Sequence, residues 1–243
     1  MSDKLRVHEI YLSAQGESTF AGLPCVFVRL AACNLRCSYC DTAYAFTGGV
    51  EMALQDVLAR VGEMARPYQT GLGPRLPLVE LTGGEPLLQS GSLDLMLGLC
   101  DAGYTVLLET SGALDIARVD PRVRRIMDLK CPSSGESHRN LWRNLEHLRP
   151  TDEIKFVMGT VEDYVWAKEQ IARHRLAAVC PLLFSWVSPL LPGQKDPSLK
   201  SVPEGHTPIT RQELVAGILA DALPVRFQLQ MHKFIWPPDQ RGV

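Results

Sequence analysis

Short apolar runs alternate along the chain with stretches patterned for helices. Six of these runs have the length and composition of buried β-strands: 25–30 (CVFVRL), 78–82 (LVELT), 104–109 (YTVLLE), 126–130 (IMDLK), 153–158 (EIKFVM) and 178–184 (AVCPLLF). In 51–65, apolar residues recur at steps of three and four, which is typical of an amphipathic helix. Strand followed by helix, repeated, predicts parallel strands joined by helical crossovers.

Local signals refine this α/β prediction. Thr160 followed by Asp163, and Thr210 followed by Glu213, indicate two capped helix starts. The Pro-rich stretch 187–208 is the long irregular insert and is predicted to be a loop. We therefore expect one domain spanning 1–243. Its functional site should lie at the carboxyl ends of the strands, where parallel folds place their chemistry.

Composition excludes several functional classes. The chain has 243 residues, 46% of them hydrophobic and 21% charged, which is ordinary for a globular protein. Its formal net charge of −2 gives no basic footprint for nucleic acid, so no nucleic-acid partner is expected. The N-terminus carries no long apolar run, so we expect no signal peptide and no membrane span, and a cytoplasmic location.

Three of the seven cysteines, Cys33, Cys37 and Cys40, fall within eight residues after the first predicted strand. Thiolates are soft ligands suited to iron–sulfur clusters or zinc, but a structural zinc site wants four closed ligands, usually as two separated pairs. A cubane cluster held by three thiolates leaves one iron open to a substrate or cofactor. Zinc completed by a distant ligand, and three incidental cysteines, remain as alternatives.

A second motif, Thr82-Gly-Gly-Glu-Pro86, directly follows the predicted strand LVEL. Two glycines allow a ligand to approach the backbone closely and free amide groups to meet charged atoms. Taken alone the motif is also a reasonable turn.

The triad Cys33-x3-Cys37-x2-Cys40, with Tyr39 before its last cysteine and GGEP downstream, resembles the signature of the radical S-adenosylmethionine (SAM) enzymes. The resemblance implies a 4Fe-4S cluster whose open iron is chelated by the amino and carboxylate groups of SAM. An electron from the cluster then cleaves SAM to a 5′-deoxyadenosyl radical. It also implies a partial, open (β/α)6-type barrel of mostly parallel strands, for which 225–230 is a candidate seventh strand.

Four further stretches, AQGES (14–18), CDT (40–42), DLKCPSSGE (128–136) and HKFIWP (232–237), extend the likeness over nearly the whole chain. Together they resemble the 7-carboxy-7-deazaguanine synthases, although the chain departs from that pattern at Ser18 and in the extension 238–243. The implied reaction is that of a carbon–nitrogen lyase in queuosine and deazapurine biosynthesis. It contracts the ring of 6-carboxy-5,6,7,8-tetrahydropterin to 7-carboxy-7-deazaguanine, releases ammonia and regenerates SAM. Alternatives are a radical SAM activase acting on a protein glycyl residue, and a non-enzymatic zinc or iron–sulfur module.

The resemblance also implies a set of site residues. The cluster ligands are Cys33, Cys37 and Cys40, and Mg2+ is bound by Thr42, which without the family would be a turn or cap residue. The substrate contacts are Ala14, Gln15, Gly16, Glu17, Arg29, Thr82, His232 and Pro237. The SAM contacts are Tyr39, Cys40, Asp41, Gly84, Ser111, Cys131, Pro132 and Ser133.

Arg29 is a charge within an apolar run, and its fork suits either the substrate carboxylate or a structural salt bridge. Glu109 is a further candidate for contact with the ribose or the pterin. A homodimer and a flavodoxin-like electron donor are expected by resemblance.

Overall fold

The computed structural model describes residues 4–68, 77–237 and 240–243. The strands described are β1 (Lys4–Ala14), β2 (Pro24–Leu30), β3 (Val50–Ala53), β4 (Leu78–Gly83), β5 (Val106–Thr110), β6 (Arg124–Asp128), β7 (Glu153–Met158), β8 (Leu182–Trp186) and β9 (Arg226–Gln228). The α-helices are α1 (Leu54–Ala65), α2 (Gly91–Asp101), α3 (Val161–His174), α4 (Arg211–Ala220) and α5 (His232–Ile235).

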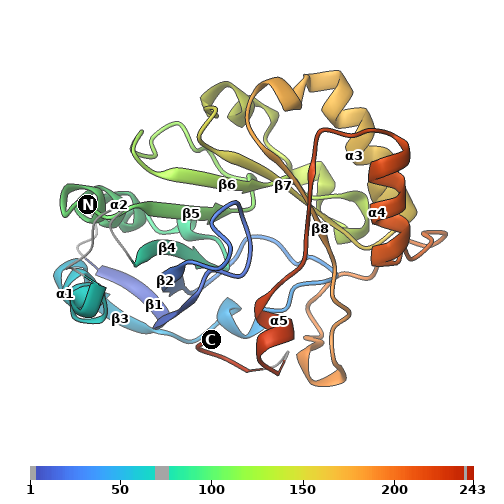
Figure 1. The fold of residues 1–243 in the computed structure, drawn as a ribbon. Coiled ribbons are helices and arrows are strands. Elements are labelled where there is room, and N and C mark those ends of the chain that lie inside the picture. The colour runs from blue at the N-terminus through green and yellow to red at the C-terminus, as the bar shows by residue number, and fades with distance from the viewer. Residues whose placement is uncertain (1–3, 69–76, 238–239) are drawn as a thin grey trace.

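The described strands form one curved sheet in the order β3-β1-β2-β4-β5-β6-β7-β8-β9. From β2 to β9 every neighbouring pair is parallel, whereas β1 pairs antiparallel with both β2 and β3. Helices α1 and α2 lie near the β1 end of the sheet, and α3 and α4 lie near β7 and β8 (Figure 1). The expected open α/β barrel of mostly parallel strands is confirmed, and 225–230 contains the seventh parallel strand, β9.

Two strands were missed, and several boundaries differ from the sequence predictions. β5 begins two residues later than predicted and β6 two residues earlier, and α1 begins at Leu54 because the three residues before it belong to β3. β1 and β3 were not predicted, because β1 alternates buried Leu5 and Val7 with charged, exposed positions and so lacks a continuous apolar run. The strand predicted at 178–184 is β8, four residues later. After α3, Arg175 adopts φ 51° and a 3-10 turn continues through Leu176–Ala178, which delays the strand.

The two faces of the sheet have different compositions because side chains alternate along each strand. In β2, Val26, Val28 and Leu30 join the large core under the helices. Cys25 and Phe27 point to the other, inner face, where Leu78, Leu107 and Ile126 of neighbouring strands pack with them.

Charged residues continue the inner face toward the carboxyl ends of the strands. Four of them, Arg29, Glu80, Glu109 and Asp128, each lie two positions after an apolar inner-face residue of the same strand, and Lys155 pairs in register with Asp128. The inner face therefore has an apolar floor and a charged rim, and the rim is where the site lies.

Both predicted helix caps are present. Thr160 and Asp163 form a capping box at α3, and Thr210 and Glu213 form another at α4. Asp163 does more than cap its helix: its carboxylate also accepts from the backbone N–H of Ser133 at 2.8 Å and of Gly159 at 2.9 Å. It is fully buried, so α3 is tied through it to the loop that follows β6.

We predict that Asp163→Ala lowers the free energy of unfolding by about 3 kcal/mol, because several buried donors lose their acceptor at once. Glu213→Ala, the matched change in the exposed α4 box, should cost about 1 kcal/mol or less. Urea denaturation of the metal-free protein measures both values. Equal losses in the two variants would show that Asp163 acts only as a helix cap.

Candidate active site

A cavity of about 500 Å³ opens at the carboxyl ends of the parallel strands. The predicted site residues that line it are Ala14, Gln15, Gly16, Glu17, Arg29, Cys33, Cys37, Tyr39, Cys40, Asp41, Thr42, Thr82, Gly84, Ser111 and His232. Four other predicted residues, Cys131, Pro132, Ser133 and Pro237, are not among the lining residues of the cavity. Motifs spread over most of the chain thus meet in one place.

The three clustered cysteines are free thiols on the loop that follows β2, and all three face the cavity. The backbone N–H of Leu35 donates to Cys33 Sγ at 3.4 Å, and Cys40 Sγ lies 3.7 Å from Thr42 Oγ1. Burial raises the pKa of all three thiols, that of Cys37 to about 12. A metal bound here must therefore displace protons as it binds.

The donor set fits a cluster better than a single ion. Among the residues described, no three His, Cys, Asp or Glu side chains converge on one point as a lone metal requires. A cubane differs, because each thiolate binds a different iron and the sulfurs stay apart. The Asn34 amide and the Tyr39 hydroxyl, on the same loop, are buried with no hydrogen-bond partner in the described part of the chain. Polar atoms left bare in this way are typical of a site that receives a polar group.

The GGEP segment places this loop by backbone contact. A Cβ atom on Gly84 would lie 2.1 Å from the carbonyl oxygen of Ala32, and one on Gly83 would lie 2.3 Å from that of Leu30. The N–H of Gly84 donates to Leu30 O at 3.2 Å. We expected these glycines to free amide groups for a ligand, but this amide is used to hold the start of the cysteine loop, although Gly84 also lines the cavity.

Glu85 of the same segment is a buried anchor. Its carboxylate accepts from Ser111 N–H at 2.8 Å, from Ser111 Oγ at 2.6 Å and from Thr110 Oγ1 at 3.0 Å. The Ser111 hydroxyl, which was predicted to contact SAM, therefore already has a partner within the protein. The contacts of Glu85 also join the end of β4 to the end of β5.

The predicted SAM residues after β6 belong to a loop that contacts the cysteine loop outside the cavity. Ser38 donates its N–H to Ser134 O at 3.1 Å and its hydroxyl to Ser133 O at 2.7 Å. Cys131 is fully buried in the core. The contacts of Ser133 and Ser134 lie between the two loops. Asp128 and Lys130, which precede this loop in the chain, do face the cavity.

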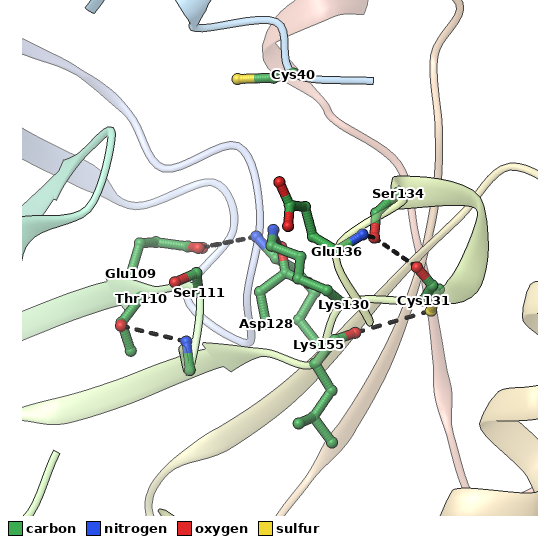
Figure 2. Close-up of polar contacts among 12 residues, drawn as sticks. Cys40, Glu109, Thr110, Ser111, Asp128, Lys130, Cys131, Ser134, Glu136 and Lys155 are labelled. Carbon is green, nitrogen blue, oxygen red and sulfur yellow. Dashed lines mark hydrogen bonds and ion pairs between the residues drawn. The ribbon is translucent and has the colours of Figure 1, made fainter. Parts of the chain in front are cut away.

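Lys155 is the central charge of the inner-face rim. Its ammonium donates to Glu17 Oε2 at 3.1 Å and to Glu109 Oε2 at 2.9 Å, and Figure 2 shows Lys155 and Glu109 pointing toward each other. Burial alone would lower the pKa of Lys155, but Glu109 and Glu17 hold it well above its usual value. Burial raises the pKa of Glu109 to about 7 despite the neighbouring ammonium.

One more charged pair and one buried hydrogen bond complete the rim. Lys130 donates to Asp128 Oδ2 at 2.6 Å, and Gln15 donates its side-chain N–H to the buried Glu80. Burial, followed by the nearby Glu109, raises the pKa of Glu80 well above its usual value. Gln15 therefore serves partly as an internal link, since its carbonyl also accepts from Glu17 N–H at 2.8 Å.

Sequence reasoning assigned no role to Glu80, Asp128 or Lys155. The signal was available, because each is a charge within an apolar strand run, which is the feature that singled out Arg29. A charged side chain within a buried strand needs a partner of opposite charge or a hydrogen bond, so such positions mark candidate site residues.

Arg29 has such a partner and also reaches the cavity. Its Nε donates to Glu9 Oε1 at 2.6 Å, and its Nη2 donates to the Tyr11 hydroxyl at 3.0 Å. Glu9 also accepts from the Tyr44 hydroxyl at 2.8 Å. The structural salt bridge that the sequence left open is present, and the guanidinium still borders the cavity.

The remaining wall comes from α5 and the chain end. Asp41 pairs with Lys233 at 2.5 Å, and the lysine keeps the pKa of Asp41 at about 2 although burial opposes this. His232 packs so closely on Gly16 that a Cβ there would lie 2.8 Å from its Nδ1. Thr42 precedes a 3-10 turn but makes no capping hydrogen bond with its side chain.

Residues 240–243 line the cavity as well, while 238–239, the rest of the C-terminal extension, lie outside the described residues. The Arg241 guanidinium lies 4.0 Å from the centroid of the Tyr44 ring. In Figure 1 the chain end lies beside α5. No described helix is long and apolar enough to cross a membrane.

Comparisons with known proteins agree with this geometry. Residues 28–133, which include the triad and GGEP, match the Radical SAM superfamily. The chain is 45% identical to the 7-carboxy-7-deazaguanine synthase of Chlorobaculum tepidum, over 98% of this chain and 97% of that protein. It is 42% identical to the synthase of Koribacter versatilis, over 98% and 100%.

Among solved structures, the fold matches QueE from Escherichia coli with a TM-score of 0.68, at 22% identity, covering 94% of this chain and 95% of that one. That likeness supports the fold, whereas the near full-length identity to the curated synthases shows the family. The chain belongs to the 7-carboxy-7-deazaguanine synthases, within the radical SAM superfamily.

Proposed function

We propose that this chain contracts the ring of 6-carboxy-5,6,7,8-tetrahydropterin to 7-carboxy-7-deazaguanine with release of ammonia. The observation that carries the proposal is the meeting, in one cavity, of three free thiols on a single loop with a rim of paired charges. A radical enzyme needs both parts. The thiols hold the group that starts the chemistry, and the charges orient a flat, polar, anionic substrate.

Cys33, Cys37 and Cys40 would hold a 4Fe-4S cluster, and the cavity beside them would take SAM. When bound, these groups supply an electron and a carbon-centred radical for removing hydrogen from the substrate. Tyr39, Asp41 and Gly84 border the cofactor side of the cavity, and the loop after β6 keeps the cysteines in place from behind.

The substrate side is formed by Arg29, Thr82 and the 14–17 segment. Arg29 has a guanidinium fixed by Glu9 and Tyr11, which presents a cation with little freedom to the substrate carboxylate. Glu17 and Glu109 are held on one ammonium, so each is oriented before substrate arrives. Because the pKa of Glu109 is about 7, it can take up or release a proton as nitrogen leaves the ring.

Thr42 is the proposed Mg2+ ligand. Its side chain has no capping bond and faces the cavity, and a hydroxyl is a hard oxygen donor that Mg2+ accepts alongside water or substrate oxygens. Asp41 is a poorer candidate, because its carboxylate is already paired with Lys233.

One-electron reduction of a cluster calls for a small redox partner, for which a flavodoxin-like protein is suited. We also propose that the chain acts as one domain, as a homodimer, in the cytoplasm, since biosynthesis of a nucleoside precursor takes place there.

Product analysis under anaerobic, reducing conditions tests the function. We expect 7-carboxy-7-deazaguanine and ammonia to form from the carboxypterin in a reaction that needs SAM but does not use it up. SAM cleavage without conversion of the carboxypterin, accompanied by a glycyl radical on an added partner protein, would favour the activase alternative instead.

Cys37→Ala should abolish both cluster assembly and turnover, because two thiolates cannot hold a three-cysteine cluster. Iron and sulfide analysis of anaerobically reconstituted protein measures the loss. Cys100→Ala is the control, since Cys100 lies in the core away from the cavity and should leave the iron content unchanged. Turnover that survives Cys37→Ala would rule out the proposed ligands.

Substrate affinity should depend on pH through Glu109. As pH rises through about 7, this carboxyl loses its proton and adds a negative charge to a cavity that receives an anionic substrate. KM for the carboxypterin should therefore increase between pH 6 and 8 in the wild type. In Glu109→Gln, whose side chain stays neutral, KM should vary less over that interval. Identical pH profiles for the two proteins would contradict this assignment.

A further inference from the structure

The Pro-rich segment 187–208 has no part in the proposed chemistry, yet residues 196–200 lie against the cysteine loop. The backbone N–H of Lys200 donates to the carbonyl oxygen of Arg36 at 2.9 Å. Ahead of it, Asp196 organises a compact turn by accepting from Ser198 N–H at 2.8 Å and from Leu199 N–H, through its carbonyl, at 3.1 Å. Defined hydrogen bonds therefore hold this segment against the cysteine loop.

The side chain of Lys200 reaches the loop that follows β6. Its ammonium pairs with Glu136 at 2.9 Å and donates to Gly135 O at 2.8 Å. Gly135 adopts φ 73°, and a Cβ there would lie 2.8 Å from Lys200 Cδ, so the lysine stem packs directly on this glycine. Lys200 therefore contacts both of the loops that enclose the triad.

Glu136 closes the junction. Its carboxylate, 5% exposed, accepts from the N–H of Arg36 at 2.8 Å while it pairs with Lys200. Burial would raise the pKa of Glu136, but Lys200 and the Arg36 amide hold it below its usual value. Figure 2 shows Glu136 beside the turn in which the Ser134 hydroxyl donates a hydrogen bond to the carbonyl oxygen of Cys131. One buried carboxylate thereby joins the cysteine loop, the β6 loop and the Pro-rich segment.

Arg36 stiffens the same loop from within. Its guanidinium donates to Cys33 O at 2.9 Å and to Leu35 O at 2.7 Å, and it lies 4.1 Å from the centroid of the Phe46 ring. Residues 193–197 also line the cavity, so the Pro-rich segment is a wall of the site as well as a support for it.

We propose that residues 196–200 form a clasp on the cysteine loop, in which Lys200 is a positioning residue that keeps the three thiols placed for the cluster. The inference rests on the proposed cluster ligands. An exposed ion pair contributes little on its own, but Lys200 pairs with a buried carboxylate, and removing one partner of such a pair leaves the other uncompensated. Loss of the clasp should make local opening of the loop easier, and iron escapes when the loop opens.

The test compares Lys200→Met with Lys168→Met in the full chain, each loaded with cluster anaerobically. Lys168 is a matched control, because it is also a partly exposed lysine that pairs with a carboxylate. It lies on α3 and pairs with Asp221, the residue that follows α4, away from the thiols. Release of iron to an excess of a ferrous chelator, followed by absorbance, is the readout.

We expect Lys200→Met to release iron about tenfold faster than wild type, the factor that corresponds to about 1.4 kcal/mol in the opening equilibrium. Lys168→Met should release iron at the wild-type rate. Lys200→Arg, which can still donate to both Glu136 and Gly135, should recover most of the protection. The melting temperature of the metal-free Lys200→Met protein should stay close to that of Lys168→Met.

Iron release from Lys200→Met at the wild-type rate would overturn the clasp. Equally faster iron release from both methionine variants would overturn it as well. A wild-type protein that assembles no cluster would instead mean that the proposed ligands are wrong, so the two failures can be told apart.

Discussion

The close approach of two backbones at the end of β4 fixes the geometry of the whole site. Gly83 and Gly84 lie so near the carbonyl oxygens of Leu30 and Ala32 that no side chain fits between them. This contact sets where β2 ends and where Cys33 begins the cysteine loop. Glu85, the next residue, then secures the end of β5 through Ser111. Three strand ends are thereby aligned by one short segment, and the cavity forms where they meet.

Electrostatics governs the other half of the cavity. Placing several charges on the inner face of a sheet is costly unless each is paired. Lys155 meets this need by pairing with Glu17 and Glu109 together, while burial raises the pKa of Glu80 well above its usual value and so disfavours its charged form. The pairs are already formed without substrate, so binding does not have to assemble them. Burial, partly offset by the Lys155 ammonium, leaves Glu109 with a pKa of about 7, which is suited to proton exchange.

Much of this arrangement could be predicted from the sequence, for identifiable reasons. The parallel strands β2, β4, β5 and β7 could be predicted because each contains a short, mostly apolar run, and the triad and GGEP are local patterns. β1 escaped prediction because it is an antiparallel strand in which charged residues flank Leu5 on both sides. Register, which local sequence does not encode, decides that Lys155 faces Glu109 and that Cys131 turns into the core.

The clasp by Lys200 was equally out of reach of sequence reasoning. It depends on residues 36, 136 and 200, which are far apart in the chain and carry no shared motif. Loop 187–208 looked like a plain irregular insert because its contacts with the cysteine loop and the β6 loop are made by Lys200 and by backbone atoms.

The central claim is that three thiolates hold a cluster with one iron left for SAM. Electron paramagnetic resonance of the reduced, anaerobically purified protein, recorded with and without SAM, tests it most directly. We predict about four irons per chain and a spectrum that changes on addition of SAM, since the cofactor becomes a ligand of the cluster. Zinc in place of iron, or a cluster spectrum indifferent to SAM, would contradict the account.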